Sequence, residues 1–410
     1  MSRPERVRPA YLILFAALYA IQGVVVAYFF NYNQGYMSAA GVAERTIGLV
    51  EFLVTIPLIV KFLGGVLSDR VNLLGFGHRK PYIVLGLALQ GLGLLGLVWV
   101  DPGRHLAAFA ALAVLAVAGL ALYDTCCDGM VLDVTPPADR ARVQGMLVAA
   151  RFLAAMACSY GFGKGLKLSG NGPGAGDWVL QTCAALSVMV LMRALTVPEP
   201  RPSADAEAFQ WAALGALVRP QALGILAFGG LYATVAYGVE INLSLFYAAR
   251  RFDADAIGAF SGARYLGRAV GGALLSLAGP RLGRGTTLAL GVLGLAAATA
   301  GQGAVAGWGL AVLMGFLFGV ANGWDDALFN VLAMEAADPR LAASTFALFM
   351  AITNLSTAGG AIVAAAVAAT GGRYDVVFLR SGLVALAALL LVPPLRRPAG
   401  AKPEPLDVDA

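Results

Sequence analysis

The sequence predicts an all-α membrane protein whose twelve transmembrane helices form two pseudo-symmetric six-helix bundles. Of its 410 residues, 59% are hydrophobic and only 13% are charged, whereas about 25% are charged in an average soluble protein. Apolar runs of about 20 residues, the length that crosses a bilayer, recur along the whole chain. The two halves of the chain also carry matching charged motifs. A soluble enzyme and a disordered chain are excluded, because the sequence lacks the polar residues that a water-exposed surface requires.

The expected spans are bounded by charged residues and by Pro/Gly breaks. The longest polar stretch separates six spans from six, which predicts a first bundle at 1–197, a cytoplasmic linker at 198–220, a second bundle at 221–395 and a cytoplasmic tail at 396–410. In order, the spans are expected at 11–31, 46–68, 81–100, 105–134, 141–163, 177–197, 221–249, 256–278, 286–304, 307–335, 341–369 and 374–395.

Lysine and arginine set the expected orientation. With the N-terminus in the cytoplasm, seventeen Lys/Arg residues fall on the cytoplasmic side and seven on the other side. This excess predicts that both termini are cytoplasmic. No cleavable signal peptide is expected, because a full-length apolar run begins at Tyr11 directly after a basic, proline-bearing start. The Ala/Gly/Arg-rich composition indicates a GC-rich bacterial genome and hence a multi-pass protein of the inner membrane.

The two halves align at two places. The run Lys61-Phe-Leu-Gly-Gly-Val-Leu in span 2 matches Arg268-Ala-Val-Gly-Gly-Ala-Leu in span 8. In span 4, Asp124, Asp128 and Asp133 match Asp326, Asn330 and Glu335 of span 10 at a constant offset. A duplicated six-helix unit with a substrate site between its copies is the architecture of many secondary carriers.

The loop after span 2 carries a family resemblance. It reads Gly65-Val-Leu-Ser-Asp69-Arg70 and then Gly77-His-Arg79-Lys80-Pro-Tyr, which resembles the signature loop of the major facilitator superfamily with five extra residues. The long loop, the Tyr123-Asp124-Thr-Cys-Cys-Asp128-Gly129 segment and the entry into span 11 at 337–360 are similar to the branch of muropeptide permeases, acetyl-CoA transporters and folate–biopterin transporters. In the second half, Gly272 to Arg284 lacks the aspartate of the signature. The resemblance implies alternating access between the bundles, with spans 3, 6, 9 and 12 at the periphery.

Ionisable residues at mid-membrane mark the expected functional centre, because each costs about 2.5–3.5 kcal/mol there and therefore usually has a partner and a role. Ten of eleven lie on spans 2, 4, 5, 7, 8 and 10, which the resemblance places around the central cavity. The eleven are Glu51, Lys61, Asp124, Asp128, Arg151, Glu240, Arg264, Arg268, Asp325, Asp326 and the exception in span 12, Arg380.

Asp124 and Asp128 are four residues apart and therefore share one helical face. Two carboxylates about 6 Å apart resist double ionisation, which suits a proton-coupling role. The alternative is a static pairing with Arg151 on the adjacent span. Asp325 and Asp326 are the matching candidates in span 10, and the repeat alignment favours Asp326 as the one that faces the cavity.

Arg151, Arg264 and Arg268 are expected to make the cavity basic and to bind an anionic substrate, because guanidinium groups bind carboxylates and phosphates bidentately. The alternative is that Arg264 and Arg268 only neutralise Asp326 and Glu240 in the second bundle. The expected substrate-binding set is Arg151, Arg264, Arg268, Gln22, Glu240 and Asn354. At the cytoplasmic ends of spans 2 to 5, a gate of salt bridges is expected from Asp69, Arg70, Arg79, Lys80, Asp133 and Arg140.

These features predict a proton-coupled secondary transporter of a hydrophilic, anionic small molecule. Its expected partners are the substrate, protons and the lipid bilayer, and it is expected to be a monomer that binds no nucleic acid. No enzymatic activity, cofactor, metal or disulfide is expected, since no nucleotide-binding Gly-rich loop occurs and the four cysteines lie in apolar runs without metal-ligand spacing. Two alternatives stay open: a sugar:proton symporter, and a non-transporting scaffold for membrane assembly.

Overall fold

The structure is a computed structural model that describes residues 7–33, 36–37, 40–75, 77–168, 177–198, 215, 217–252, 254–338 and 341–396. Every regular element within these residues is a helix. Most of the expected linker at 198–220, and the expected tail beyond Arg396, lie outside the described residues.

The first bundle contains six spans, of which the second is interrupted. They are α1 (Pro9–Asn31), α3 (Glu44–Ile59) continued by α4 (Phe62–Arg70), α5 (Lys80–Val98), α6 (Leu106–Val134), α7 (Arg140–Leu168) and α8 (Asp177–Thr196). The 3-10 turns Leu73–Gly75 and Pro137–Asp139 lie in two of its connections.

The second bundle repeats this plan. It consists of α9 (Pro220–Ala249), α10 (Ala254–Ala278), α11 (Arg284–Gln302), α12 (Trp308–Ala336), α13 (Ala342–Leu355) continued through the 3-10 turn Ser356–Ala358 into α14 (Gly359–Ala369), and α15 (Tyr374–Ala385) continued through the 3-10 segment Leu386–Leu391 into α16 (Val392–Leu395). A 3-10 turn, Gly279–Arg281, follows α10.

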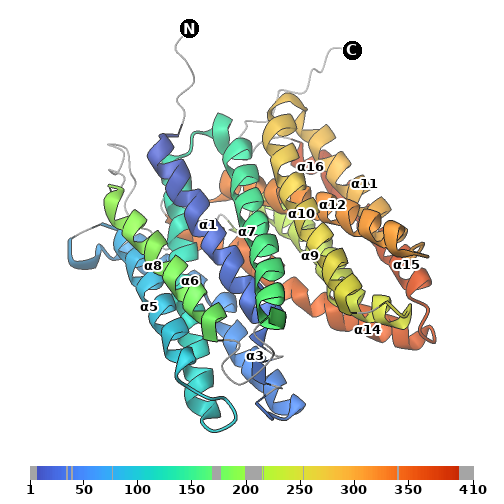
Figure 1. Ribbon diagram of the computed structural model, residues 1–410. Helices are drawn as coiled ribbons and strands as arrows, with labels where there is room; N and C mark the ends of the chain where they lie inside the picture. The colour runs from blue at the N-terminus through green and yellow to red at the C-terminus, as the bar shows by residue number, and fades with distance from the viewer. Residues whose placement is uncertain are drawn as a thin grey trace, which may run out of the picture.

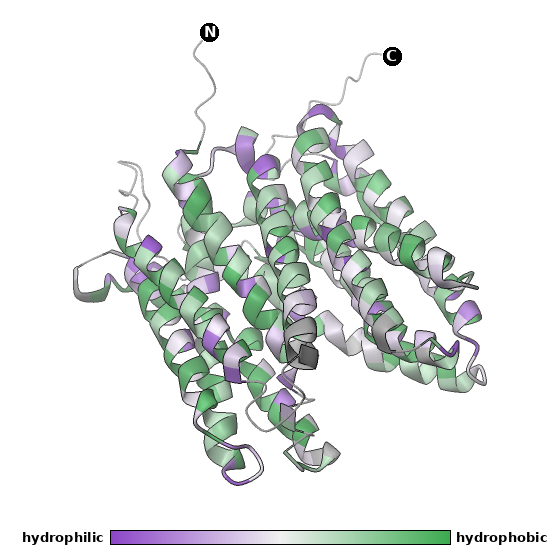
Figure 2. Ribbon diagram, in the orientation of Figure 1, coloured by the Kyte–Doolittle hydropathy of each residue, from purple (hydrophilic) through white to green (hydrophobic). Residues whose placement is uncertain are grey.

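All twelve expected spans are present, and their ends agree with the expected ones to within about five residues. Nine of the helices in the described part of the chain are long and apolar enough to cross a membrane by themselves. The other three, α10, α11 and α12, have spanning length but a more polar composition. Figure 2 shows hydrophobic residues along the helices of both bundles, with hydrophilic residues gathered at helix ends and in patches between helices.

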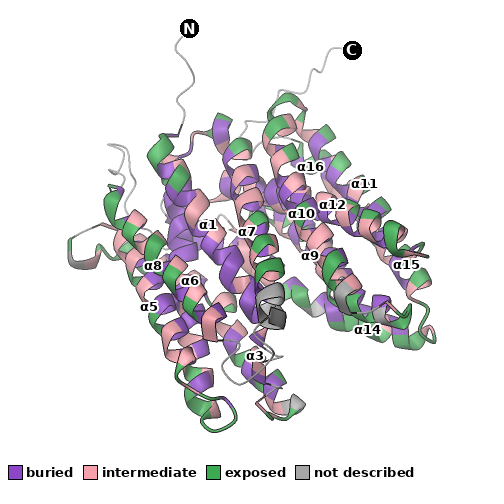
Figure 3. Ribbon diagram, viewed as in Figure 1, coloured by how far each residue is buried: buried purple, intermediate pink, exposed green. Residues whose placement is uncertain are grey.

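The outer and inner helices differ in their neighbours. Helices α5, α8, α11 and α15 pack within their own bundle, as expected for spans 3, 6, 9 and 12. Their outward faces carry exposed large apolar side chains, for example Leu92, Met189 and Leu383, which suit contact with lipid tails. Buried residues instead line the inner helices such as α1 (Figure 3). The bundles meet through α7 with α10 and through α4 with α13.

Within the described residues, the two bundles pack most closely on one side of the molecule. We call this side, where α1 begins and α16 ends (Figure 1), the terminal side. Here a Cβ at Gly145 would lie 2.2 Å from the carbonyl oxygen of Gly272, so glycine allows α7 and α10 to touch. Toward the opposite side, a Cβ at Gly161, Gly258 or Gly262 would meet no atom within 4 Å. The interface between the bundles is therefore closed on the terminal side and open on the opposite side.

The interruption of span 2 exposes backbone groups to the other bundle. Pro57 lies inside α3, and the helix stops at Ile59 before it resumes at Phe62. The carbonyl of Leu58 is left without its helical partner and accepts a hydrogen bond of 3.0 Å from the Asn354 side chain on α13. Asn354, expected to bind substrate, therefore joins the two bundles in this conformation.

Candidate functional site

Each bundle contains one buried ion pair between its second and its fourth span. In the first bundle, the Lys61 ammonium lies 2.9 Å from the Asp124 carboxylate. In the second, Nε of Arg268 lies 3.6 Å from the Asp326 carboxylate. These are the positions that the internal repeat aligns, so the repeated sequence corresponds to a repeated contact. Lys61 occupies the break between α3 and α4, which brings its side chain to the face of α6.

Polar groups on α1 complete the first cluster. Gln22 donates a hydrogen bond of 3.0 Å to Asp124, and the Tyr19 hydroxyl donates one of 2.6 Å to Asp128. All four side chains are nearly inaccessible to solvent. Within the described residues, Asp128 forms no ion pair, so its carboxylate depends on Tyr19 and on more distant charges.

Arg151 on α7 faces this cluster without joining it. A Cβ at Gly23 would lie 2.0 Å from the Arg151 carbonyl oxygen, so α1 and α7 touch at this level. The Nε of Arg151 is buried and has no hydrogen-bond partner, and within the described residues the guanidinium forms no ion pair. A static pair of Arg151 with Asp124 or Asp128 is absent, since Lys61, Gln22 and Tyr19 already hold these carboxylates.

In the second bundle, two arginines share two carboxylates. Glu240 on α9 lies 3.1 Å from Nε of Arg264 and 3.1 Å from a terminal nitrogen of Arg268. Asp326 accepts a hydrogen bond of 3.2 Å from the Tyr232 hydroxyl in addition to its contact with Arg268. Because Arg264 and Arg268 are four residues apart, they lie on one face of α10 and reach the same acids. The charges of this cluster balance within the bundle.

Aromatic rings connect the two clusters across the bundle interface. The Phe152 ring of α7 stacks on the Tyr265 ring of α10 with centroids 6.3 Å apart. The Arg268 guanidinium lies 4.7 Å from the Phe152 centroid and 5.4 Å from that of Tyr237. These contacts favour a closed interface directly beside Arg151.

Asp325 lies apart from this arrangement. Its carboxylate is fully buried and has no hydrogen-bond partner, and it faces α11 at Gly291, where glycine leaves room for it. Adjacent residues on a helix point about 100° apart, so only Asp326 of the two reaches the centre. A second buried polar side chain without a partner, Asn322, lies one turn away on α12.

The terminal side carries a compact charged contact between the bundles. Arg79 lies 2.5 Å from Asp69 and 2.9 Å from Asp133. Asp69 also accepts hydrogen bonds from the backbone N–H of Ser344 at 2.8 Å and from its hydroxyl at 2.6 Å. An acid of the first bundle therefore caps the N-terminus of α13 in the second bundle, where the helix dipole favours a negative charge.

The other expected gate residues do not join this contact. Arg70 is exposed and forms no ion pair within the described part of the chain, and Lys80 donates a hydrogen bond to the Leu195 carbonyl oxygen at 2.8 Å. Arg140 has a buried Nε without a hydrogen bond. Glu335, the counterpart of Asp133 in the second bundle, pairs with Arg284. The second bundle thus has its own counterpart of the Arg79–Asp133 pair, although its signature loop lacks the aspartate.

Three contributors were not in the expected site. Lys61 is a mid-membrane cation that could add to a basic cavity but is not in the expected substrate-binding or proton-coupling set, and its alignment with Arg268 is the signal for its pairing. Tyr19 lies one turn before Gln22 on α1, so helical spacing places both on one face. Ser344, at the start of α13, lies in the gate, where its hydroxyl donates a hydrogen bond to Asp69. No sequence signal assigns it there, because the contact depends on how the bundles meet.

Known proteins of similar sequence and structure support one family. The family model described as Major Facilitator Superfamily matches residues 10–253. A relative named probable folate-biopterin transporter 9, chloroplastic, from Arabidopsis thaliana is 30% identical over 124 residues, which span 30% of this chain and 23% of that protein.

Solved structures agree along almost the whole chain. The human organic anion transporter MFSD10 superposes with a TM-score of 0.71 at 16% identity, covering 94% of this chain and all of that one. FucP in the outward conformation gives 0.72 at 13% identity, with 95% and 99% covered. The proton:xylose symporter XylE gives 0.71 at 14% identity, with 95% and 96% covered. At these identities the likeness shows the fold alone, and together with the family match it establishes that the chain belongs to the Major Facilitator Superfamily.

Proposed function

We propose that this transporter carries an organic anion together with protons across the inner membrane of a bacterium, by alternating access. The observation that carries the proposal is Arg151, a cation deep in the first bundle whose guanidinium forms no ion pair within the described residues. A half-buried cation of this kind favours binding of a carboxylate or phosphate, to which guanidinium can donate two parallel hydrogen bonds.

The charges around Arg151 suggest how a proton is coupled to the anion. At the centre of the first bundle, Arg151 has one further cation, Lys61, and two acids, Asp124 and Asp128, as neighbours. With both acids ionised the cluster is neutral, so an added anion has no net attraction. When Asp128 is protonated, one positive charge remains in a low-dielectric setting, and an anion is then strongly favoured. Proton and anion therefore enter as a neutral pair, which is the logic of symport.

The conformation indicates the side from which substrate and proton would enter. The interface is closed on the terminal side by Asp69 and Ser344 and by the Phe152–Tyr265 stack, and is open on the opposite side. The excess of Lys/Arg in the terminal-side loops argues that this side is cytoplasmic. The structure then corresponds to an outward-facing state, ready to receive substrate and proton from outside.

The substrate class follows from charge and from the aromatic neighbours. Arg151 suits an acidic group, and the rings of Phe152, Tyr265 and Tyr237 suit a flat or apolar portion of the same molecule. Two of the similar proteins, the probable folate-biopterin transporter and the organic anion transporter, are named for substrates of this class. Candidates from the resembling branch are a pterin or folate, a sugar–peptide fragment of the cell wall, and an acyl-CoA-like compound.

A sugar:proton symporter is the second candidate. The stacked Phe152 and Tyr265 rings favour it, since sugar rings commonly pack on aromatic faces, and XylE is a sugar symporter of the same fold. Under this alternative Arg151 would donate hydrogen bonds to hydroxyl groups. Neutral disaccharides, rather than anions, would then compete for the site.

The test is transport in proteoliposomes. A thermal-shift screen of anions and neutral sugars first selects the ligand that raises the melting temperature. Uptake of that ligand should accumulate under an inward proton gradient and collapse with an uncoupler. Asp128→Asn should abolish gradient-driven accumulation but retain counterflow exchange, because the neutral amide mimics the protonated acid. Uptake that ignores the gradient, or an Asp128→Asn variant that still accumulates substrate, overturns proton coupling.

A further inference from the structure

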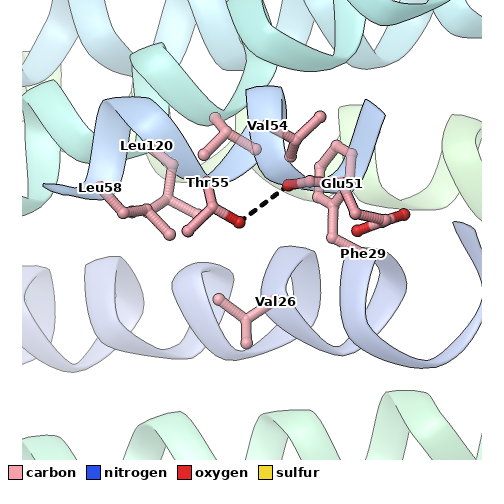
Figure 4. Close-up of a pocket in the computed structure, with 8 residues that line it drawn as sticks. Val26, Phe29, Glu51, Val54, Thr55, Leu58 and Leu120 are labelled. Atoms are coloured by element: carbon pink, nitrogen blue, oxygen red, sulfur yellow. Dashed lines mark hydrogen bonds between the residues drawn. The ribbon is translucent and has the colours of Figure 1, made fainter. Parts of the chain in front are cut away.

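A pocket separate from the ion-pair clusters lies between α1, α3 and α6 (Figure 4). It is apolar except for Glu51 and Thr55 on α3. Its remaining lining residues are Val26, Phe29, Val54, Leu58, Val117 and Leu120. One turn further toward the terminal side, the same three helices carry Gln22, Lys61 and Asp124, so the pocket ends at the first cluster.

Glu51 is the only charged residue of this pocket, and it is held in place. Its Oε1 accepts a hydrogen bond of 2.7 Å from Asn33, which is itself fully buried and accepts one of 3.3 Å from Tyr28. The Thr55 hydroxyl donates a hydrogen bond of 2.9 Å to the backbone carbonyl oxygen of Glu51 (Figure 4), so it does not donate one to the Glu51 carboxylate. One carboxylate oxygen is thus fixed by an amide while the other remains available to a ligand.

No cation within the described residues neutralises this carboxylate. The next cation along the chain is Lys61, which lies ten residues later and is bound to Asp124; ten residues correspond to roughly 15 Å along a helix. The pocket face of α1 presents only Val26 and Phe29, and that of α6 only Val117 and Leu120. A carboxylate in such an apolar wall is costly unless it is paired.

We infer that this pocket binds a small organic cation, an ammonium group attached to a compact apolar body. The ammonium would meet the Glu51 carboxylate, and the apolar body would lie against the valine, leucine and phenylalanine side chains. A hard metal ion does not fit, because Mg²⁺ and Ca²⁺ require six or more oxygen ligands and the pocket offers one carboxylate. The site lies apart from Arg151, so the inference stands independently of the proposed anion transport.

The test uses the full chain purified in detergent, with benzylammonium as the probe and benzyl alcohol as its neutral analogue. Benzylammonium should raise the melting temperature in a saturable way, while benzyl alcohol at equal concentration should not. Glu51→Gln keeps the size of the side chain and an acceptor for Asn33, and it should weaken benzylammonium binding by about tenfold or more. Val26→Phe, which fills the pocket and keeps the charge, should weaken it as well.

Two further variants make the outcome decisive. Asp101→Asn removes an exposed carboxylate that lies beside Arg104 and outside the pocket, and it should bind benzylammonium normally. Arg151→Lys should also bind it normally, because the anion site is separate. Equal stabilisation by benzyl alcohol, or unchanged benzylammonium affinity in folded Glu51→Gln, overturns the inference. Loss of binding in Arg151→Lys would place the cation at the anion site and would overturn it too.

Discussion

Arg151→Lys separates a substrate-binding role of this side chain from simple charge balance. The substitution keeps the positive charge near Asp128 but removes the planar fork that holds a carboxylate through two hydrogen bonds. Because Arg151 forms no ion pair within the described residues, the substitution breaks no salt bridge there and changes only the contact of the guanidinium with the Phe152 ring, 5.4 Å away. The fold should therefore persist, while affinity for the anion should fall by about 1–3 kcal/mol, the value of a hydrogen bond to a charged group. This corresponds to roughly 5- to 150-fold in the dissociation constant.

Arg264→Lys is the matched control, since it makes the same chemical change at an arginine that is already paired with Glu240. It should retain anion affinity and lose some thermal stability, because a buried ion pair is weakened. Affinity is measured by titration calorimetry on purified protein and checked against the melting temperature of each variant. Normal affinity in Arg151→Lys removes Arg151 from the substrate site. An equal loss in both variants would show that total positive charge, and not the position of Arg151, attracts the anion.

Two further predictions concern the gate and the buried acids. Asp69→Ala should weaken the cap on α13 by about 0.5–2 kcal/mol and shift the population toward states open on the terminal side, which is measured as faster labelling of single cysteines placed there. Arg70→Gln, at an exposed position, should leave labelling unchanged, and equal labelling in both variants would contradict the role of Asp69 at Ser344. Asp325→Asn should retain transport and melting temperature, because this carboxylate has no cation to lose, whereas Asp326→Asn should lower both. A severe defect in Asp325→Asn alone would show that its carboxylate has a function that its surroundings do not reveal.

The helices were predictable because a membrane span leaves a long apolar signal. Helices α10 and α12 were found as well, since their few charged residues are embedded in long apolar sequence. The interruption of span 2 was not foreseen, although Pro57 was visible. A proline alone does not decide between a bend and a stop, because that depends on whether a neighbouring helix can satisfy the carbonyl groups left where the helix stops, as Asn354 does for Leu58.

Within the site, the sequence partly predicted which residues meet inside each bundle. It did not predict which cation pairs with Asp124 or which residues meet between the bundles. The repeat alignment matches Lys61 to Arg268 and Asp124 to Asp326. In the structure, each cation forms an ion pair with the acid of its own bundle, Lys61 with Asp124 and Arg268 with Asp326. The choice of Lys61 over Arg151 as the partner of Asp124 depends on the rotation of α7, which helical spacing within one helix does not determine. The contact between Asp69 and α13 joins residues about 275 positions apart, and no pattern in either segment identifies the other.

The distribution of contacts explains how such a molecule can change its state. Both buried ion pairs lie inside single bundles, so neither has to break when the bundles rock against each other. Between the bundles, the described contacts include the hydrogen bonds of Asp69 to Ser344 and of Asn354 to Leu58, and the stack of Phe152 on Tyr265. Each is worth about 0.5–3 kcal/mol, so their sum is of the size that separates two populated conformations. When an anion neutralises Arg151 and a proton neutralises Asp128, the change in charge occurs beside Phe152, at the part of the interface that has to open.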